Sequence, residues 1–126
     1  MKLRKILIII MAIFSLVWGV GFIIIPKFFW SLYNITLDSQ GVYISRQLGT
    51  LFFMLGLILW LAKGDPGSIA LRAIIIGLFI GNTLGFILGL IGQLTVEISA
   101  LGWVGVFSFL ILALGFGYTL IKNNIS

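Results

Sequence analysis

Four long apolar segments, separated by short polar ones, make up nearly all of this chain of 126 residues. They cover about 6–25, 42–62, 69–94 and 100–121. A helix of about 20 residues crosses a hydrocarbon core about 30 Å thick, so each segment is long enough to span a bilayer. Lipid offers no partners to backbone N–H and C=O groups, and helices satisfy these groups internally. The sequence therefore predicts an all-α fold, a bundle of four transmembrane helices that forms one integral membrane domain over residues 1–126.

Composition indicates the same environment. Hydrophobic residues make up 61% of the chain and charged residues 9%, whereas roughly a quarter of an ordinary soluble domain is charged. A soluble domain of this size leaves much of its surface in water, so it could not hide so many apolar side chains. We infer that lipid is the solvent of most of them.

The first segment has to be compared with a secretory signal peptide, because Lys2, Arg4 and Lys5 precede it. Its uncharged run from Ile6 to Ile25 is longer than the apolar region of about 7–15 residues in signal peptides, and no A-x-A-like cleavage site closes it. We expect this segment to be retained as the first transmembrane helix.

Pro26 ends the first span, and the segment 27–40 that follows alternates aromatic with polar residues. Amphipathic aromatic side chains such as Trp30 and Tyr33 favour the level of the lipid headgroups. We therefore expect a short interfacial helix between the first two spans.

The distribution of basic residues predicts the orientation. Four spans place both termini on one side of the membrane, and six of the eight basic residues fall on that side: Lys2, Arg4, Lys5, Lys63, Arg72 and Lys122. The opposite side holds Lys27 and Arg46. Cytoplasmic loops carry the excess of Lys and Arg, so we expect cytoplasmic termini. We expect a prokaryotic cytoplasmic membrane, because no other eukaryotic secretory feature accompanies the glycosylation-type triplet at 34–36.

The third span carries a row of small residues at every fourth position, which consists of Ala73, Gly77, Gly81, Gly85 and Gly89. Such rows let helix backbones approach closely in lipid, so the row predicts that the third span is a packing centre. Positions four apart drift around a helix of 3.6 residues per turn, so the row is expected to serve two neighbours, one in the chain and one in another subunit. Small residues on the other spans are candidate partners: Ala12, Ser15, Gly19, Gly49, Gly56, Gly105, Ser108 and Ala113.

Arg46, followed by Gln47, lies at the outer end of the second span, on the same side as Asp38 and Glu97. An unpaired buried guanidinium is costly, so we expect Arg46 to bond one of these carboxylates or a nearby carbonyl. Two interpretations stay open. Arg46 is either a structural pin between loop and bundle or, with Gln47, part of an anion or lipid-headgroup site.

Asn82 lies near the middle of the third span and Arg72 near its start. An amide in lipid is expected to bond across helices, so Asn82 is either structural glue or a polar site in a cavity. Arg72 is expected to snorkel to a lipid headgroup. The turn before this span contains Lys63 and Asp65, which we interpret as solvated, and Ser68, a candidate N-cap.

Several functions lack the residues they need. The chain has no His and no Cys, so we expect no metal site, no cofactor and no thiol chemistry. No basic face with aromatic residues over it suggests a nucleic-acid partner. Only three acids are present and none lies at mid-membrane, whereas acid–base catalysis needs a positioned titratable pair. We therefore expect no enzyme, and no proton-coupled exporter of the small multidrug type.

The stretch from Ile44 to Lys63 resembles small bacterial and archaeal DoxX-like four-helix membrane proteins. The match includes an Arg-x-x-Gly pattern, here Arg46 and Gly49, at the opening of the second helix. Leu-Gly-Trp at 101–103, opening a glycine-rich last helix, is similar as well. The resemblance implies a four-helix bundle. Some members accompany quinone- or thiol-linked redox partners, and the absence of Cys gives no support to a thiol role here.

These observations favour a non-catalytic protein, a small membrane scaffold or accessory subunit that holds a lipid or another apolar ligand among its helices. Its expected partners are membrane lipids and either further copies of itself or another membrane protein. The alternative is an oligomeric transporter or channel with a pathway near Asn82 and Arg46.

Overall fold

The computed structural model describes residues 2–95 and 100–123. Their helices, in chain order, are α1 (Lys2–Ile24), α2 (Pro26–Ser31), α3 (Ser39–Ala62), α4 (Ile69–Thr95) and α5 (Gly102–Asn123). The four long helices are apolar and long enough to cross a membrane, and the short α2 lies between the first two. The predicted all-α fold with four spanning helices and a short helix after the first is confirmed.

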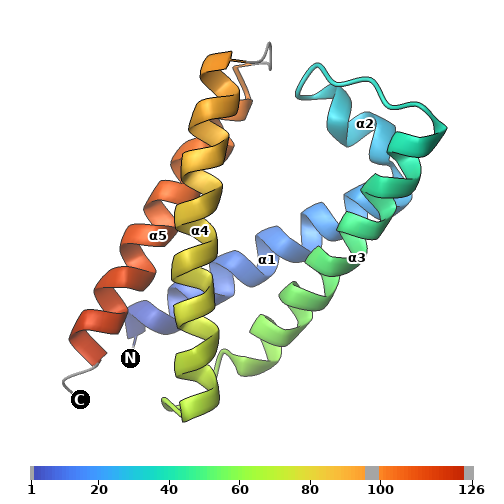
Figure 1. Ribbon diagram of the computed structural model, residues 1–126. Helices are drawn as coiled ribbons and strands as arrows, with labels where there is room; N and C mark the ends of the chain where they lie inside the picture. Colours follow the sequence, from blue (N-terminus) through green and yellow to red (C-terminus); the bar gives the residue numbers. More distant parts are fainter. Residues whose placement is uncertain (1, 96–99, 124–126) are drawn as a thin grey trace.

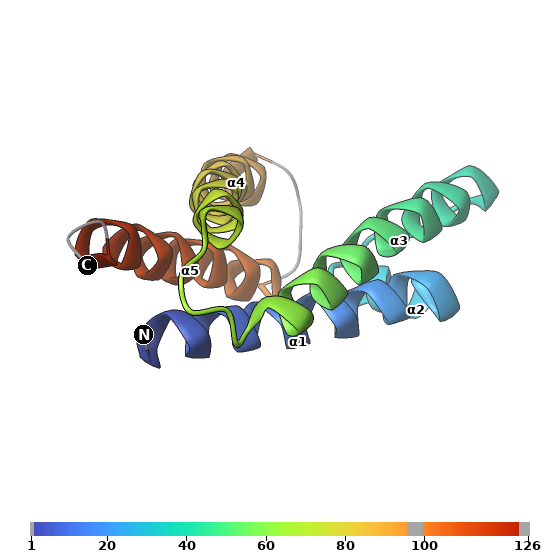
Figure 2. The same ribbon diagram turned by 90° about the horizontal axis from the view of Figure 1, so that it is seen from below.

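The helices form two pairs, α1 with α3 and α4 with α5, and α1 also contacts α5 (Figure 1). The pairs diverge toward the end that carries α2, and α4 is steeply inclined to α1 and α3 (Figure 2). One buried cluster joins them, with side chains from all four long helices: Leu7, Ile8, Ala12, Leu59, Leu71, Ile75, Leu78, Leu112 and Phe116. Since its α1 members lie in the first half of that helix, the second half of α1 is left without α4 and α5 against it.

Small residues bring α1 and α3 into close contact. A Cβ added to Gly49 would lie 2.7 Å from the Gly19 carbonyl oxygen, and one added to Gly56 would lie 3.0 Å from the Ala12 oxygen. These residues lie seven apart on each helix, the spacing that keeps a face in register along a left-handed helix pair. Within the described chain α1 is the most buried long helix and α4 the least. The packing centre is therefore α1, and the glycine row of α4 does not mark it.

The α1–α2 corner is fixed by proline and by aromatic contacts. Pro26 occupies the first turn of α2, where its missing N–H costs nothing. The indole N–H of Trp30 donates to the Ser45 hydroxyl at 2.8 Å, and that hydroxyl donates to the Phe22 carbonyl at 3.4 Å. The Trp30 ring also stacks on Phe22, with centroids 4.8 Å apart. These contacts hold α2 against both α1 and α3.

The turn between α3 and α4 is organised by Asp65. Its carboxylate accepts from the backbone N–H groups of Gly67 and Ser68, both at 2.8 Å, and from the Ser68 hydroxyl at 2.9 Å. These bonds, above all the one from the Ser68 backbone N–H and then the one from Gly67, lower the pKa of Asp65 below its usual value, and the charge of Arg4 contributes. The Ser68 hydroxyl accepts from the Leu71 N–H at 3.1 Å, so Ser68 caps α4. The interpretation of Asp65 as merely solvated is therefore incomplete.

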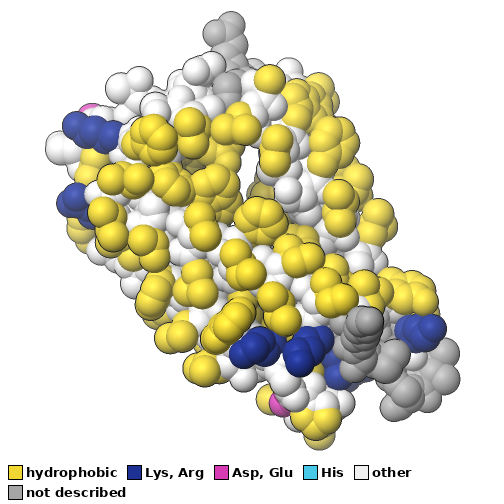
Figure 3. Space-filling view, turned by 180° about the vertical axis from the view of Figure 1, so that it is seen from behind, with side chains coloured by type: hydrophobic (Ala, Val, Ile, Leu, Met, Phe, Trp, Pro, Cys, Tyr) yellow, Lys and Arg dark blue, Asp and Glu magenta, His cyan; other side chains and the backbone are white. Residues whose placement is uncertain are grey.

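Arg4 ties the start of α1 to this turn. Its side chain is buried, and a terminal nitrogen donates to the Asp65 carbonyl at 3.5 Å. Gly67 lies beside the guanidinium with φ +125°, a conformation that suits glycine. The first residues of α1 and the α3–α4 turn therefore lie at the same end of the molecule. Figure 3 shows basic side chains gathered toward both ends, with apolar side chains covering the band between them.

Candidate functional site

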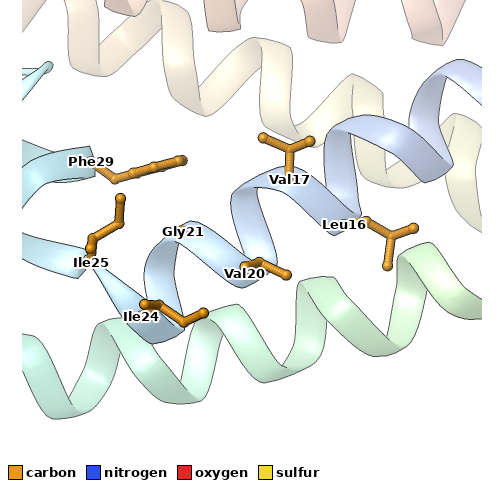
Figure 4. A pocket seen from close by; sticks show the side chains of 7 residues that line it. All are labelled: Leu16, Val17, Val20, Gly21, Ile24, Ile25 and Phe29. Atoms are coloured by element: carbon orange, nitrogen blue, oxygen red, sulfur yellow. The ribbon is translucent and has the colours of Figure 1, made fainter.

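An open apolar groove of about 580 Å³ follows the second half of α1. Figure 4 shows its lining side chains along α1, with Phe29 of α2 reaching over from one end. The lining residues are all apolar: Leu16, Val17, Val20, Gly21, Ile24, Ile25 and Phe29.

The groove follows from the local sequence and the divergence of the helix pairs. Val17, Val20, Gly21 and Ile24 recur at the spacing that places residues on one face of a helix. Gly21 allows α2 to close one end, because a Cβ at this position would overlap the Phe29 ring. Because α4 and α5 pack only against the first half of α1, this face stays uncovered.

Two basic residues, neither of them part of the lining, lie near the α1–α2 corner where the groove ends. Lys27 lies between the lining residues Ile25 and Phe29 in the chain, and its side chain is exposed. Arg46 of α3 donates from Nε to the carbonyl of Ile23 at 3.0 Å, beside the lining residue Ile24. The guanidinium therefore satisfies a carbonyl at the C-terminal end of α1, where a positive charge is also favourable.

The other described members of the predicted Arg46 cluster do not take part in this hydrogen bond. Asp38 is the N-cap of α3, and its carboxylate accepts from the Gly41 N–H at 2.7 Å. Gln47 is exposed on α3, and Glu97 lies outside the described residues. The sequence left either a carboxylate or a carbonyl as the partner of Arg46, and the structure shows the carbonyl of Ile23.

Asn82 is buried in the middle of α4, with 2% of its surface exposed. Its amide nitrogen donates to the Leu78 carbonyl of its own helix at 2.7 Å, and its contact across helices is with the Met11 sulfur at 3.5 Å. Sulfur is a weak acceptor. The Asn82 Oδ1 atom is buried without a hydrogen-bond partner in the described chain, and the bond across helices that the sequence predicts is present as the contact with the Met11 sulfur.

The small-residue row of α4 is divided between two environments. A Cβ at Gly85 would lie 2.7 Å from the Phe109 ring of α5, and one at Gly89 would lie 3.3 Å from Val106. Gly77 and Gly81 have no atom within 4 Å of such a Cβ, and both are exposed, as is Ala73. Two residues of the row therefore pack within the chain and three face outward.

Arg72 lies exposed in the first turn of α4, the same end of the molecule as Arg4 and the turn at 63–68. Two further cations at helix ends contact aromatic rings. The Lys63 ammonium lies 4.1 Å from the Trp60 ring centre, and that of Lys122 lies 5.8 Å from the Tyr118 ring centre. Basic side chains beside Trp or Tyr are typical of helix ends at a membrane interface.

No protein-family model, curated protein or solved structure matches this chain. The resemblance to DoxX-like proteins therefore stays a prediction, and the function has to be argued from the groove and its surroundings.

Proposed function

We propose that this chain is a non-catalytic integral membrane protein that binds a lipid acyl chain in the groove along α1 and acts as a scaffold or accessory subunit. The observation that carries the proposal is the lining, in which all seven residues are apolar. The groove lies along the membrane-spanning part of α1. An acyl chain can cover its apolar lining without leaving any polar side chain of the lining without a hydrogen-bond partner.

The test is to titrate delipidated protein in detergent with phosphatidylcholine and to count retained lipids by native mass spectrometry. We expect one phosphatidylcholine molecule per protein to be retained much more strongly than any further molecules. Val20→Trp fills the groove and should abolish this retention. Val104→Trp, at another exposed valine on α5, is the matched control and should retain the lipid. Equal retention by the two variants would contradict the proposal.

The transporter alternative is favoured by one observation, the buried Asn82 Oδ1 atom without a partner. A pathway from Asn82 to Arg46 would have to cross between α4 and α3, which do not pack side by side. Reconstituted protein with ion- and solute-flux readouts tests this function, since flux that Asn82→Leu removes would support it over lipid binding.

We also propose that a second copy packs on the three outward-facing residues of the α4 row, Ala73, Gly77 and Gly81. Exposed small residues at spacing four allow a close helix approach in lipid. Gly77→Leu should shift the protein toward monomer in sedimentation experiments in detergent. Gly105→Leu is the control on α5, where a Cβ also meets nothing within 4 Å. An unchanged dimer fraction in Gly77→Leu would contradict this interface.

The expected orientation belongs to the proposal as well. Cytoplasmic termini in a prokaryotic cytoplasmic membrane would place the Arg4, Arg72 and Lys122 end inside and the groove in the outer half of the bilayer. Cysteine accessibility at Asn34→Cys, labelled from outside intact cells, tests it. Labelling only after lysis would show that the protein has the opposite orientation.

A further inference from the structure

The groove ends at the α1–α2 corner, near two cations, Lys27 of α2 and Arg46 of α3. Along α1 the lining extends from Leu16 to Ile24, about 12 Å at 1.5 Å per residue. Half of a hydrocarbon core is about 15 Å deep. The groove therefore has the length of one lipid leaflet, which suits an acyl chain and is too short for a whole spanning helix.

The polar end of such a lipid would meet positive charge. Lys27 is exposed and forms no hydrogen bond with the described residues. Arg46 is anchored through Nε to the Ile23 carbonyl, and no described residue accepts from its two terminal nitrogens. An anchored guanidinium keeps its planar fork of donors fixed, the geometry that suits a phosphate.

Little negative charge competes for these two cations. In the described chain the carboxylates are those of Asp38 and Asp65. Asp38 caps the first turn of α3, and Asp65 organises the turn at the opposite end of α3. Among the described residues, the α1–α2 corner therefore carries two positive charges against the one carboxylate of Asp38, a balance that an anionic headgroup would complement.

From this geometry we propose that the groove is selective for an anionic phospholipid, with one acyl chain along α1 and the phosphate held by Arg46 and Lys27. The proposal rests on the lipid-binding function above and adds the headgroup class. A zwitterionic headgroup brings its own cation close to the phosphate, so it gains less from two basic side chains. Each basic residue near a membrane surface contributes about a five-fold preference for anionic lipid.

The experiment compares phosphatidylglycerol with phosphatidylcholine of identical acyl chains, by competitive titration of delipidated protein at low salt and native mass spectrometry. The wild type should retain phosphatidylglycerol at least about five-fold better. Lys27→Gln should reduce that preference, and Arg46→Gln should reduce it further. Lys5→Gln, an exposed lysine in the first turn of α1 at the other end of the molecule, should leave it unchanged.

Folding is checked in each variant by helicity and thermal unfolding, since Arg46→Gln also loses the Ile23 bond. Two variants can test the role of the basic side chains if Arg46→Gln unfolds. Lys27→Gln breaks no described hydrogen bond, and Arg46→Lys keeps the positive charge at this position. An excess of inorganic phosphate should not displace the lipid, because the acyl chain supplies most of the binding.

The outcomes separate the two proposals. If both lipids are retained equally and Val20→Trp releases both, the groove binds chains and the headgroup inference is overturned. If neither lipid is retained, the lipid-binding function fails too. If phosphate alone competes fully, the site is a free-anion site and the inference is overturned. If Val20→Trp turns a dimer into a monomer and lipid retention stays the same, the groove holds a second copy, which also overturns it.

Discussion

Gly49→Ala is expected to push α1 and α3 apart. The added Cβ would lie 2.7 Å from the Gly19 carbonyl oxygen and 2.9 Å from the Phe22 Cβ. Ordinary van der Waals contact begins near 3.4 Å, so the helices must separate locally by about 0.7 Å. The obstructing atoms are a backbone oxygen and a side-chain atom next to the backbone, and neither can swing away.

The cost can be estimated from two opposing effects. Overpacking a closely packed interface costs about 1–3 kcal/mol. Replacing a helical glycine by alanine returns about 0.5–1 kcal/mol through backbone entropy. Gly105→Ala on α5 has the second effect without the first, because nothing lies within 4 Å of its Cβ. The difference between the two variants therefore isolates the overpacking cost, and we expect it to be about 1–3 kcal/mol.

The assay is equilibrium unfolding in mixed micelles, followed by helicity, for wild type and both variants. Gly49→Ala should be less stable than Gly105→Ala by that difference. Gly49→Ala should also weaken the Arg46 bond to the Ile23 carbonyl, since both lie on the face that is forced apart. Equal stability of the two alanine variants would refute the close α1–α3 contact.

Three further variants test separate contacts. Ser45→Ala removes the acceptor of the Trp30 indole and should cost about 0.5–1.5 kcal/mol in the same unfolding assay, whereas no loss would mean that α2 is held by ring packing alone. Asn82→Leu removes a buried acceptor without a partner and should leave stability unchanged or raise it by about 1 kcal/mol; a clear loss of stability would restore the structural-glue interpretation. Because the pKa of Asp65 is lowered in the fold, its stabilisation is present above the ordinary carboxyl pKa and is lost as the pH falls through the lower folded value. Melting temperatures measured from neutral to acid pH should therefore fall less steeply in Asp65→Ala than in wild type, and parallel curves would contradict this.

The helices themselves could be predicted from the sequence because their signals are local. Hydropathy sets the four long helices, Pro26 separates α1 from α2, and Ser68 is placed to cap α4. Each of these depends on neighbours within a few residues in the chain, and the environment of the rest of the protein hardly changes them.

The pairing of the helices could not be predicted in this way. Small residues occur on all four spans, and the row on α4 is the most regular in the sequence. The close contact instead uses Gly19 and Gly49, with Ala12 and Gly56 one repeat further along. Choosing between these patterns requires knowing which helices face each other, and lipid gives apolar faces no preference for one helix over another.

Only part of the candidate site could be predicted from the sequence. Arg46 was identified, and a carbonyl was one of its two expected kinds of partner. The bond from Arg4 to the turn joins residues 61 positions apart, so no local pattern could signal it. The groove was missed because Val17, Val20 and Ile24 look like any lipid-facing stripe, and only the divergence of the two helix pairs makes that stripe a groove.

The most direct test of lipid binding in the groove is photocrosslinking with a phospholipid that carries a photoreactive group midway along its acyl chain. Adducts on wild-type protein in bilayers would be mapped by peptide sequencing. We predict that they concentrate on the lining residues between Leu16 and Ile25 and on Phe29, and that excess unlabelled anionic phospholipid competes for them. Adducts spread evenly over this segment and over exposed α4 residues such as Leu84 and Leu88, without competition, would contradict a lipid-binding groove.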